Sequence, residues 1–234
     1  MSLIGILRKT LVDSRSDKSI AFKFRQRRAL RILALINDCY QKYHQVNIID
    51  IGGTRAYWDI IPYSFLKERN VRISLVNLNM KTALSSGEEV FSYVSGNGCD
   101  LNAFEDKSFH IAHSNSVIEH VGKWDDMLRF SNETKRVAQS WYLQTPNYWF
   151  PFEPHFVVPF FHWLPRGIRV FMVMHFRLGW GNKPDNIQDA KALVNSCNLL
   201  CKRKLRKLFP ESSFYKERFL FFNKSHIVVK NAFY

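Results

Sequence analysis

Residues 46–53 read Val-Asn-Ile-Ile-Asp-Ile-Gly-Gly, and this stretch decides the fold. A short run of β-branched residues that ends in glycine is typical of a buried parallel strand followed by a tight turn. In an open α/β sheet, ligands bind at the carboxyl ends of the strands, where a glycine turn lets the backbone approach them closely. Gly52 and Gly53 are therefore predicted to lie beside a ligand.

Strands and helices are predicted to alternate along the rest of the chain. Apolar residues at three- and four-residue steps predict an amphipathic helix over 19–43, with an apolar face of Leu30, Leu33, Ile36, Tyr40 and Tyr43. Further strands are predicted at 71–78, 91–94, 109–114 and 140–144. Helices are predicted at 124–138, 168–178 and 187–208, and a closing antiparallel strand pair at 214–222 and 226–230. This alternation predicts an α/β fold with a mostly parallel sheet.

The chain carries a strong positive charge. Its 34 lysines and arginines exceed its 20 acids, which gives a formal net charge of +14 at pH 7. Such a charge favours anionic partners, and much of it lies in residues 18–31 and 202–207, although solvated helix faces explain both clusters equally well. No helix-turn-helix, zinc-finger or aromatic RNA-binding signature accompanies the charge, so nucleic acid is not the expected partner.

Composition and cysteine usage indicate a globular protein of a reducing compartment. The 234 residues are 46% hydrophobic and 23% charged, as expected for a single globular domain. The four cysteines have neither CxxC nor zinc-ribbon spacing, so free thiols are predicted. The sequence has no secretory signal pattern and no run of about 18 apolar residues. We expect a cytoplasmic protein, with peripheral contact at the inner membrane face as an alternative.

Four segments resemble the class I S-adenosylmethionine-dependent methyltransferases, especially the small, type 11-like members associated with bacterial surface polysaccharide gene sets. They are VNIIDIGGTRAYW (46–58), ISLVNLN (73–79), GNGCDLNAFEDKSFHIAHSNSVIEHV (96–121) and WYLQTPNYWFPFEPHFVVPFFHWLP (141–165). The resemblance implies a Rossmann-like class I methyltransferase sandwich with S-adenosylmethionine as cofactor. It implies a single methyltransferase domain over 45–234, with a substrate-side loop insertion at about 146–186, and the helical pattern before it predicts a basic amphipathic N-terminal helical extension over 1–44.

The same resemblance assigns the cofactor site. Two asparagines of this site stand where the family commonly has acids, so they keep an acceptor oxygen but lack the charge that strengthens such bonds. Tyr57 and Trp58 follow the glycine turn, and their rings either stabilise the sulfonium of the cofactor or pack beneath the turn. The assigned residues are Asp50, Gly52, Gly53 and Thr54 at the methionyl part, Asn77 at the ribose hydroxyls, Asn97 near the adenine, and Ser114 and Asn115 closing the pocket.

The catalytic prediction rests on histidine. If the methyl acceptor is a hydroxyl, a base beside it assists the transfer, and histidine is the usual base at neutral pH. His155, oriented by Glu153, is the first candidate, and His120 is the second. His113 and His162 are weaker candidates, because a single histidine is more often a hydrogen-bonded structural residue. No set of His, Cys, Asp and Glu has the sequence spacing of a metal site.

The resemblance also implies O-methylation of a sugar or another small hydroxyl acceptor in polysaccharide biosynthesis. The positive charge is compatible with a phosphorylated or lipid-linked acceptor. The aromatic stretch 149–180 contains three arginines, and it either lines the pocket and core or touches a membrane interface.

Other functions stay open alternatives. A nicotinamide-dependent oxidoreductase would need G-x-G-x-x-G and a later acid, and both are missing. A non-catalytic binding protein of methyltransferase fold remains an alternative, because Thr54 and Ala56 replace two family glycines. A basic adaptor on a membrane or nucleic acid is the third alternative, and it would bind without any cofactor.

Overall fold

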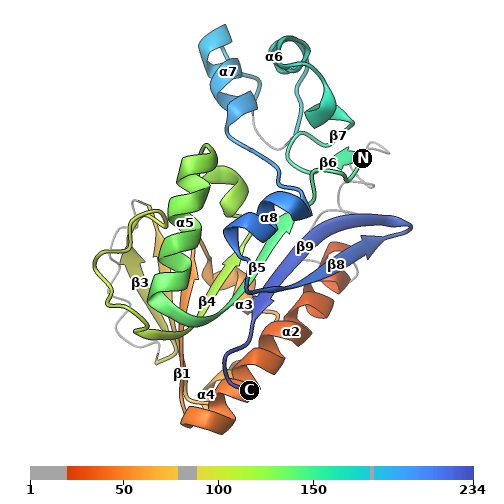
Figure 1. Cartoon of the computed structure of the whole chain (residues 1–234). Coiled ribbons are helices and arrows are strands. Elements are labelled where there is room, and N and C mark those ends of the chain that lie inside the picture. Colours follow the sequence, from red (N-terminus) through yellow and green to blue (C-terminus); the bar gives the residue numbers. More distant parts are fainter. Residues whose placement is uncertain (1–19, 79–88, 180–181) are drawn as a thin grey trace.

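A seven-stranded sheet forms the centre of the structure, a computed structural model that describes residues 20–78, 89–179 and 182–234 (Figure 1). The strand order is β3-β2-β1-β4-β5-β9-β8, and the first five of these strands are parallel. Antiparallel β9 and the hairpin it forms with β8 close the sheet. The strands are β1 (Val46–Ile51), β2 (Val71–Asn77), β3 (Phe91–Ser95), β4 (Phe109–Asn115), β5 (Ala138–Pro146), β8 (Ser213–Phe219) and β9 (Phe222–Lys230). The predicted α/β fold with its closing strand pair is confirmed.

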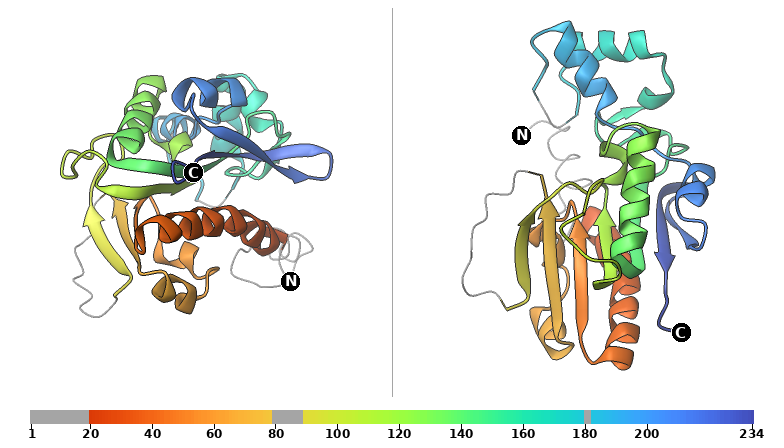
Figure 2. Two further views of the ribbon diagram at one scale, coloured as in Figure 1. Left: turned by 60° about the horizontal axis from the view of Figure 1, so that its bottom comes forward. Right: turned by 60° about the vertical axis from the view of Figure 1, so that its left-hand side comes forward.

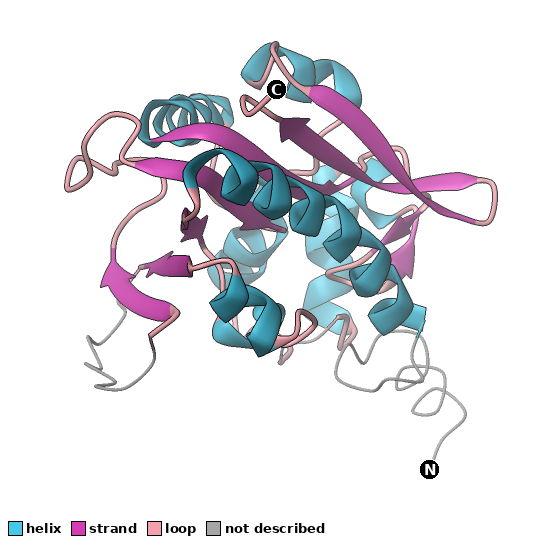
Figure 3. Ribbon diagram, turned by 90° about the horizontal axis from the view of Figure 1, so that it is seen from below, coloured by secondary structure: helices cyan, strands magenta, loops and turns pink. Residues whose placement is uncertain are grey.

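Helices cover both faces of the sheet, so the structure has three layers (Figures 2 and 3). Because side chains alternate along a strand, Ile48 of β1 packs into the core on one face, and Ile49 and Ile51 pack into the core on the other. The first face is covered by α2 (Ile20–Tyr43), α3 (Arg55–Trp58) and α4 (Tyr63–Glu68), and the second by α5 (Trp124–Val137) and α8 (Lys202–Leu208).

The helix predicted over 19–43 is present as α2, but its apolar face differs from the prediction. Leu30 is 66% exposed, and Leu33, Tyr40 and Tyr43 lie only at the rim of the core. The buried stripe lies about one residue earlier along the helix than predicted, so the prediction missed Ile32 and Leu35 as well as two small residues. The residues that α2 buries are Ala29, Ile32, Leu35, Ile36 and Cys39. Residues 1–19 of the predicted N-terminal extension lie outside the described residues.

The single helix predicted over 187–208 is wrong. The chain instead forms α7 (Ile187–Asn195), a loop, and α8. The loop is rich in residues whose side chains bond to backbone groups and so end helices. Ser196 Oγ donates to the Leu193 carbonyl at 2.8 Å, and Asn198 Nδ2 donates to the Gly122 carbonyl at 3.0 Å. The loop therefore turns towards the end of β4 and brings Cys197 with it.

The chain between β5 and α8 lies above the carboxyl edge of the sheet (Figure 1). It contains the short strand pair β6 (Phe152–Glu153) and β7 (Val158–Pro159), the 3-10 helix η2 (Phe161–Trp163), and α6 (Arg166–His175). Together with α7 these elements share a small core of their own, made of Phe156, Phe161, Val170, Val173, Ala190 and Val194. Trp180, the last residue of the predicted aromatic stretch, lies outside the described residues.

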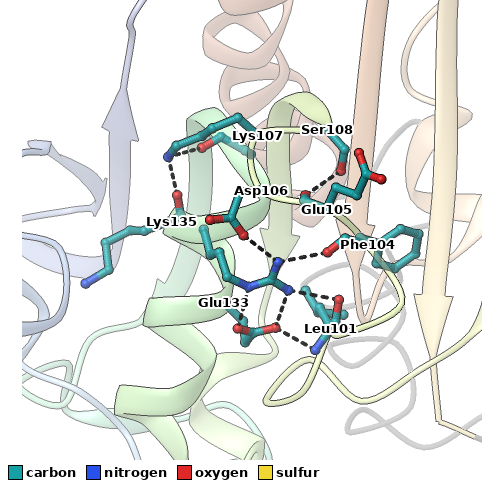
Figure 4. Close-up of polar contacts among 10 residues, drawn as sticks. Leu101, Phe104, Glu105, Asp106, Lys107, Ser108, Glu133 and Lys135 are labelled. Carbon is teal, nitrogen blue, oxygen red and sulfur yellow. Dashed lines mark hydrogen bonds and ion pairs between the residues drawn. The ribbon is translucent and has the colours of Figure 1, made fainter.

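Arg136 of α5 fixes the loop between β3 and β4, whose residues Leu101, Phe104 and Asp106 are labelled in Figure 4. Its guanidinium donates to the carbonyls of Leu101 at 2.9 Å and Phe104 at 2.8 Å. The same group pairs with Glu133 at 2.8 Å and Asp106 at 2.9 Å. Only a planar guanidinium has enough N–H donors to bond to carbonyls and carboxylates in several directions at once.

Arg136→Lys is therefore expected to destabilise the protein while keeping the charge. We expect a loss of about 1–2 kcal/mol, because the carbonyl bonds are lost at a site that is partly exposed to water. This corresponds to a fall in Tm of about 2–8 °C, measured by thermal unfolding. Arg129→Lys on the same helix is the control, because Arg129 is exposed and pairs with Asp126 three residues away. Equal melting of the two variants would contradict the assigned role of Arg136.

Candidate active site

A cavity of about 920 Å³ opens at the carboxyl ends of the parallel strands. Its lining includes Gly52 after β1, Asn77 at the end of β2, Asn97 after β3 and His120 after β4. Strand order reverses between β1 and β4, and such a reversal is where open α/β sheets bind their ligands. Its volume lies within the usual range of small-molecule sites.

The glycine turn that borders the cavity excludes side chains at two positions. Gly52 has φ +75°, a left-handed conformation, and a Cβ there would lie 2.6 Å from a methyl group of Val117. At Gly53 a Cβ would lie 1.7 Å from Oδ2 of Asp50. The turn therefore requires glycine first for its backbone conformation and then for space.

Asp50 supports the turn from beneath. Its side chain is fully buried, Oδ2 accepts a hydrogen bond from Trp58 Nε1 at 2.8 Å, and Oδ1 lies 2.7 Å from His113 Nδ1. The rings of Tyr57 and Trp58 are buried against His113, with centroids 4.7 and 5.0 Å from it. Of the two roles considered for Tyr57 and Trp58, the structure shows packing under the turn, and it places His113 in the same buried network.

Two of the assigned asparagines present polar groups to the cavity. Asn77 donates from Nδ2 to the Gly53 carbonyl at 2.6 Å, which leaves its Oδ1 to accept from a ribose hydroxyl. Asn97 Oδ1 accepts from the backbone N–H of Cys99 at 3.0 Å, which leaves its Nδ2 to donate to a nitrogen of adenine. These residues, together with the glycine turn, fit an S-adenosyl group.

The other assigned residues, Thr54, Ser114 and Asn115, are not among the described residues that line the cavity. Ser114 Oγ donates to the Ile51 carbonyl at 3.0 Å, and Asn115 Oδ1 accepts from Arg28 of α2 at 3.3 Å. Thr54 precedes α3 as its N-cap residue. Sequence reasoning missed Asp100, an acid that lines the same cavity. Its signal was present, because it follows the turn that contains Asn97.

The three predicted catalytic residues lie together and are joined by a cysteine. Glu153 Oε1 lies 2.7 Å from His155 Nδ1, and His155 Nε2 lies 3.1 Å from His120 Nε2. Cys197 Sγ lies 3.3 Å from Nδ1 and 3.9 Å from Nε2 of His155. We call these four residues the histidine cluster. No sequence pattern indicated Cys197, because its contact with His155 exists only where three separate segments of the chain meet.

The histidine cluster separates two cavities. His120 lines the cavity at the glycine turn, whereas Glu153 and Cys197 line a second cavity of about 450 Å³. The second cavity lies beneath η2 and α7, and His162, one of the weaker candidates, also lines it. His162 Nε2 lies 2.7 Å from the Tyr148 carbonyl, so this histidine holds the wall of the cavity in place.

Buried carboxylates give the cluster a negative surrounding. Burial raises the pKa of Glu119 to about 7, and its Oε2 accepts from Thr145 at 2.8 Å. Burial alone would lower the pKa of His155, but the hydrogen bond and charge of Glu153, with Glu119 behind it, raise the pKa overall. Burial lowers the pKa of His120, and burial with the same two carboxylates raises that of the Cys197 thiol. The charged imidazolium form is therefore favoured at His155 and disfavoured at His120.

Parts of the chain match a protein family and a curated relative. Residues 52–140 match the family described as Methyltransferase domain. An uncharacterized protein of Mycobacterium tuberculosis strain H37Rv is 31% identical over 114 residues, which cover 49% of this chain and 37% of that relative. The chain thus spans little more than a third of the length of its curated relative.

Two solved structures share the fold at low identity. The PH0226 protein from Pyrococcus horikoshii OT3 is 17% identical and superposes with a TM-score of 0.52, covering 99% of each chain. Magnesium protoporphyrin IX methyltransferase from Synechocystis PCC 6803, solved with bound SAH, is 8% identical with a TM-score of 0.50 and covers 88% of this chain and 82% of its own. The family match includes Gly52 and nearly all residues that line the cavity at the glycine turn, and the two solved structures share the fold of the chain.

Proposed function

We propose that the protein transfers the methyl group of S-adenosylmethionine to a hydroxyl of a sugar or another small acceptor. The observation that carries the proposal is the position of the histidine cluster between the cofactor cavity and the second cavity. The bound cofactor supplies an activated methyl group on a sulfonium, so the protein must mainly hold an acceptor oxygen in line with it. The cofactor would lie on the glycine turn, and the acceptor would enter from the second cavity.

The histidine cluster is proposed to act on the acceptor hydroxyl. His120 lines the cavity at the glycine turn and lies 3.1 Å from His155, and the reacting oxygen would lie beside this pair. Glu153 is 2% exposed and holds His155 through Nδ1, so it is a positioning residue. The loop that carries Glu153 and His155 is constrained, because Val157 is held at φ +59°, an unusual conformation for a β-branched residue. Such strain is often found at functional sites.

Basic residues around the second cavity support an acidic acceptor. Lys123, Arg169 and Lys204 line this cavity and come from three different parts of the chain. Phosphate and carboxylate groups bind where such cations converge. We therefore propose a phosphorylated acceptor, such as a nucleotide-linked or lipid-linked sugar, consistent with the net charge of +14 and with a role in polysaccharide biosynthesis.

An exposed aromatic surface favours the lipid-linked form of this acceptor. Ring contacts connect the β8–β9 hairpin to the segment after β5, since Phe150 lies 6.5 Å from both Phe219 and Phe222. The same surface continues through Trp149 and Trp163, whose rings are 6.2 Å apart. At the hairpin tip, Leu220 and Phe221 are 75% and 97% exposed, and Lys216 and Arg218 precede them. Aromatic residues beside cations suit the interface of an anionic membrane.

We propose that this surface binds the inner face of a bacterial membrane peripherally. No helix in the described part of the chain is long and apolar enough to cross a bilayer. The variant Leu220→Glu with Phe221→Glu should bind phosphatidylglycerol vesicles at least about 10-fold more weakly in co-sedimentation, because each inserted side chain contributes about 1.5–3 kcal/mol. Tyr63→Glu on α4, at the other end of the sheet, should bind as the wild type does. Equal binding of all three proteins would refute membrane contact through the hairpin.

Transfer of labelled methyl groups to a panel of nucleotide sugars and glycolipid extracts tests the proposed function. We expect label in at least one phosphorylated sugar, at a position that becomes a methyl ether. Label in no fraction, from protein that binds the cofactor, would contradict the proposed acceptor class.

A further inference from the structure

The hydrogen bonds of the two clustered histidines define which ring nitrogens carry protons. His120 Nδ1 lies 2.9 Å from the Ser196 carbonyl, an oxygen that can only accept, so this nitrogen is the N–H donor. His155 Nδ1 lies 2.7 Å from the Glu153 carboxylate and is the donor there. In both neutral rings the proton is therefore on Nδ1, and Nε2 is left with a lone pair.

The two Nε2 lone pairs point at the same place. These nitrogens are 3.1 Å apart, and two acceptors at this distance repel unless a positive charge lies between or beside them. The charge is either a shared proton or a metal ion. Anchoring of Nδ1 by a carboxylate or a backbone carbonyl, with Nε2 free, is the arrangement that metal-binding histidines usually have.

A third possible ligand atom favours a metal ion over a shared proton. The donor atoms of His120, His155 and Cys197 all lie within 4.8 Å of one another. In a tetrahedral zinc site, bond lengths place two nitrogens about 3.3 Å apart and a nitrogen and a sulfur about 3.6 Å apart. The observed separations are 3.1 Å between the Nε2 atoms and 3.9 Å from Cys197 Sγ to His155 Nε2. Cys197 Sγ also lies 3.3 Å from His155 Nδ1, so the thiol has to turn towards the two Nε2 atoms when it binds the ion.

We propose that His120 Nε2, His155 Nε2 and Cys197 Sγ form a zinc site at the boundary between the two cavities. Two imidazoles and one thiolate are the ligand types that zinc prefers, and three protein ligands leave one position open, as in catalytic zinc sites. Buried Glu119 lies close behind the cluster, and its Oε1 has no hydrogen-bond partner among the described residues. Binding replaces the thiol proton of Cys197, which is released to solvent.

The zinc site defines how the acceptor hydroxyl is activated. This activation step rests on the proposed function. An acceptor hydroxyl at the open position of the ion loses its proton to solvent, because a bound cation lowers the pKa of the hydroxyl. The oxygen then forms a bond to the methyl carbon, and the bond from this carbon to sulfur breaks with its electron pair left on sulfur. The products are a methyl ether and S-adenosylhomocysteine.

The test uses the full chain, stripped with a chelator and titrated with zinc chloride in a calorimeter without cofactor or acceptor. We expect one equivalent of zinc to bind, and binding at least about 10-fold weaker in Cys197→Ser and His155→Asn. Cys201→Ser, four residues away and outside the cluster, is the matched control and should bind as the wild type does. Cobalt should give a thiolate-to-metal charge-transfer band that is absent from Cys197→Ser only.

The outcomes separate this inference from the proposed function. Zinc binding that is absent, or that Cys197→Ser leaves unchanged, would overturn the metal site. Unchanged methyl transfer by the stripped protein in a chelating buffer would also overturn it, while the proposed function would stand. One equivalent of zinc in a protein that transfers no methyl group would support the site and would count against the proposed function alone.

Discussion

Gly53→Ala should abolish cofactor binding and lower the stability of the whole domain. A Cβ at this position would lie 1.7 Å from Oδ2 of Asp50, so the carboxylate has to move. Its movement breaks the bonds to Trp58 and His113 and leaves a buried charge without its partners. Disrupting such a buried pair costs about 3–5 kcal/mol. For a chain of this size we expect a fall in Tm of about 6 °C or more in thermal unfolding.

Gly167→Ala is the matched control for this substitution. Gly167 lies in the first turn of α6, and a Cβ there would meet no atom within 4 Å. Alanine also favours a helix more than glycine does, so this variant should melt at or slightly above the wild-type temperature. If Gly53→Ala melts and binds S-adenosylhomocysteine as the control does, the role given to the turn is wrong.

His155→Asn should lower the turnover number about 100-fold or more while leaving the affinity for S-adenosylmethionine unchanged. His155 is central to the histidine cluster, whereas the residues assigned to the cofactor lie on the other side of His120. Glu153→Gln keeps an acceptor for Nδ1 but removes the charge. Loss of such a supporting partner typically lowers activity about 10–100-fold. Steady-state kinetics with the acceptor identified in the panel, together with calorimetry of cofactor binding, measures both effects.

A histidine remote from the site is the control for these variants. His44 lies just before β1 at the amino edge of the sheet, with φ +54°, a conformation that asparagine also tolerates. His44→Asn should therefore keep normal turnover. Turnover of His155→Asn equal to that of His44→Asn would remove His155 from the mechanism.

Local patterns predicted the sheet well. The run from Val46 to Gly53 is a complete signal in itself, because a buried strand and a glycine turn are both specified by adjacent residues. The α2 helix shows the limit of the same method. Its existence follows from periodicity, but which neighbouring stripe of apolar residues is buried depends on how the helix packs on the sheet, and Ala29 and Ile32 are buried whereas Leu30 is exposed.

The candidate site could be predicted only in part, because some of its contacts join residues that are far apart in the sequence. His155 and Glu153 are close in sequence, and His120 belongs to a segment that resembles a family, so these residues could be named in advance. The meeting of His120 and His155 spans 35 residues, and that of His155 and Cys197 spans 42. Cys197 is placed by the break between α7 and α8, where a continuous helix was predicted.

Calorimetric titration of the purified protein with S-adenosylmethionine and S-adenosylhomocysteine tests the central claim most directly. We predict saturable binding of one equivalent of each compound at the glycine turn, lost in Gly53→Ala and retained in His155→Asn. Absence of binding at millimolar concentrations of both compounds would contradict the proposed methyltransferase function.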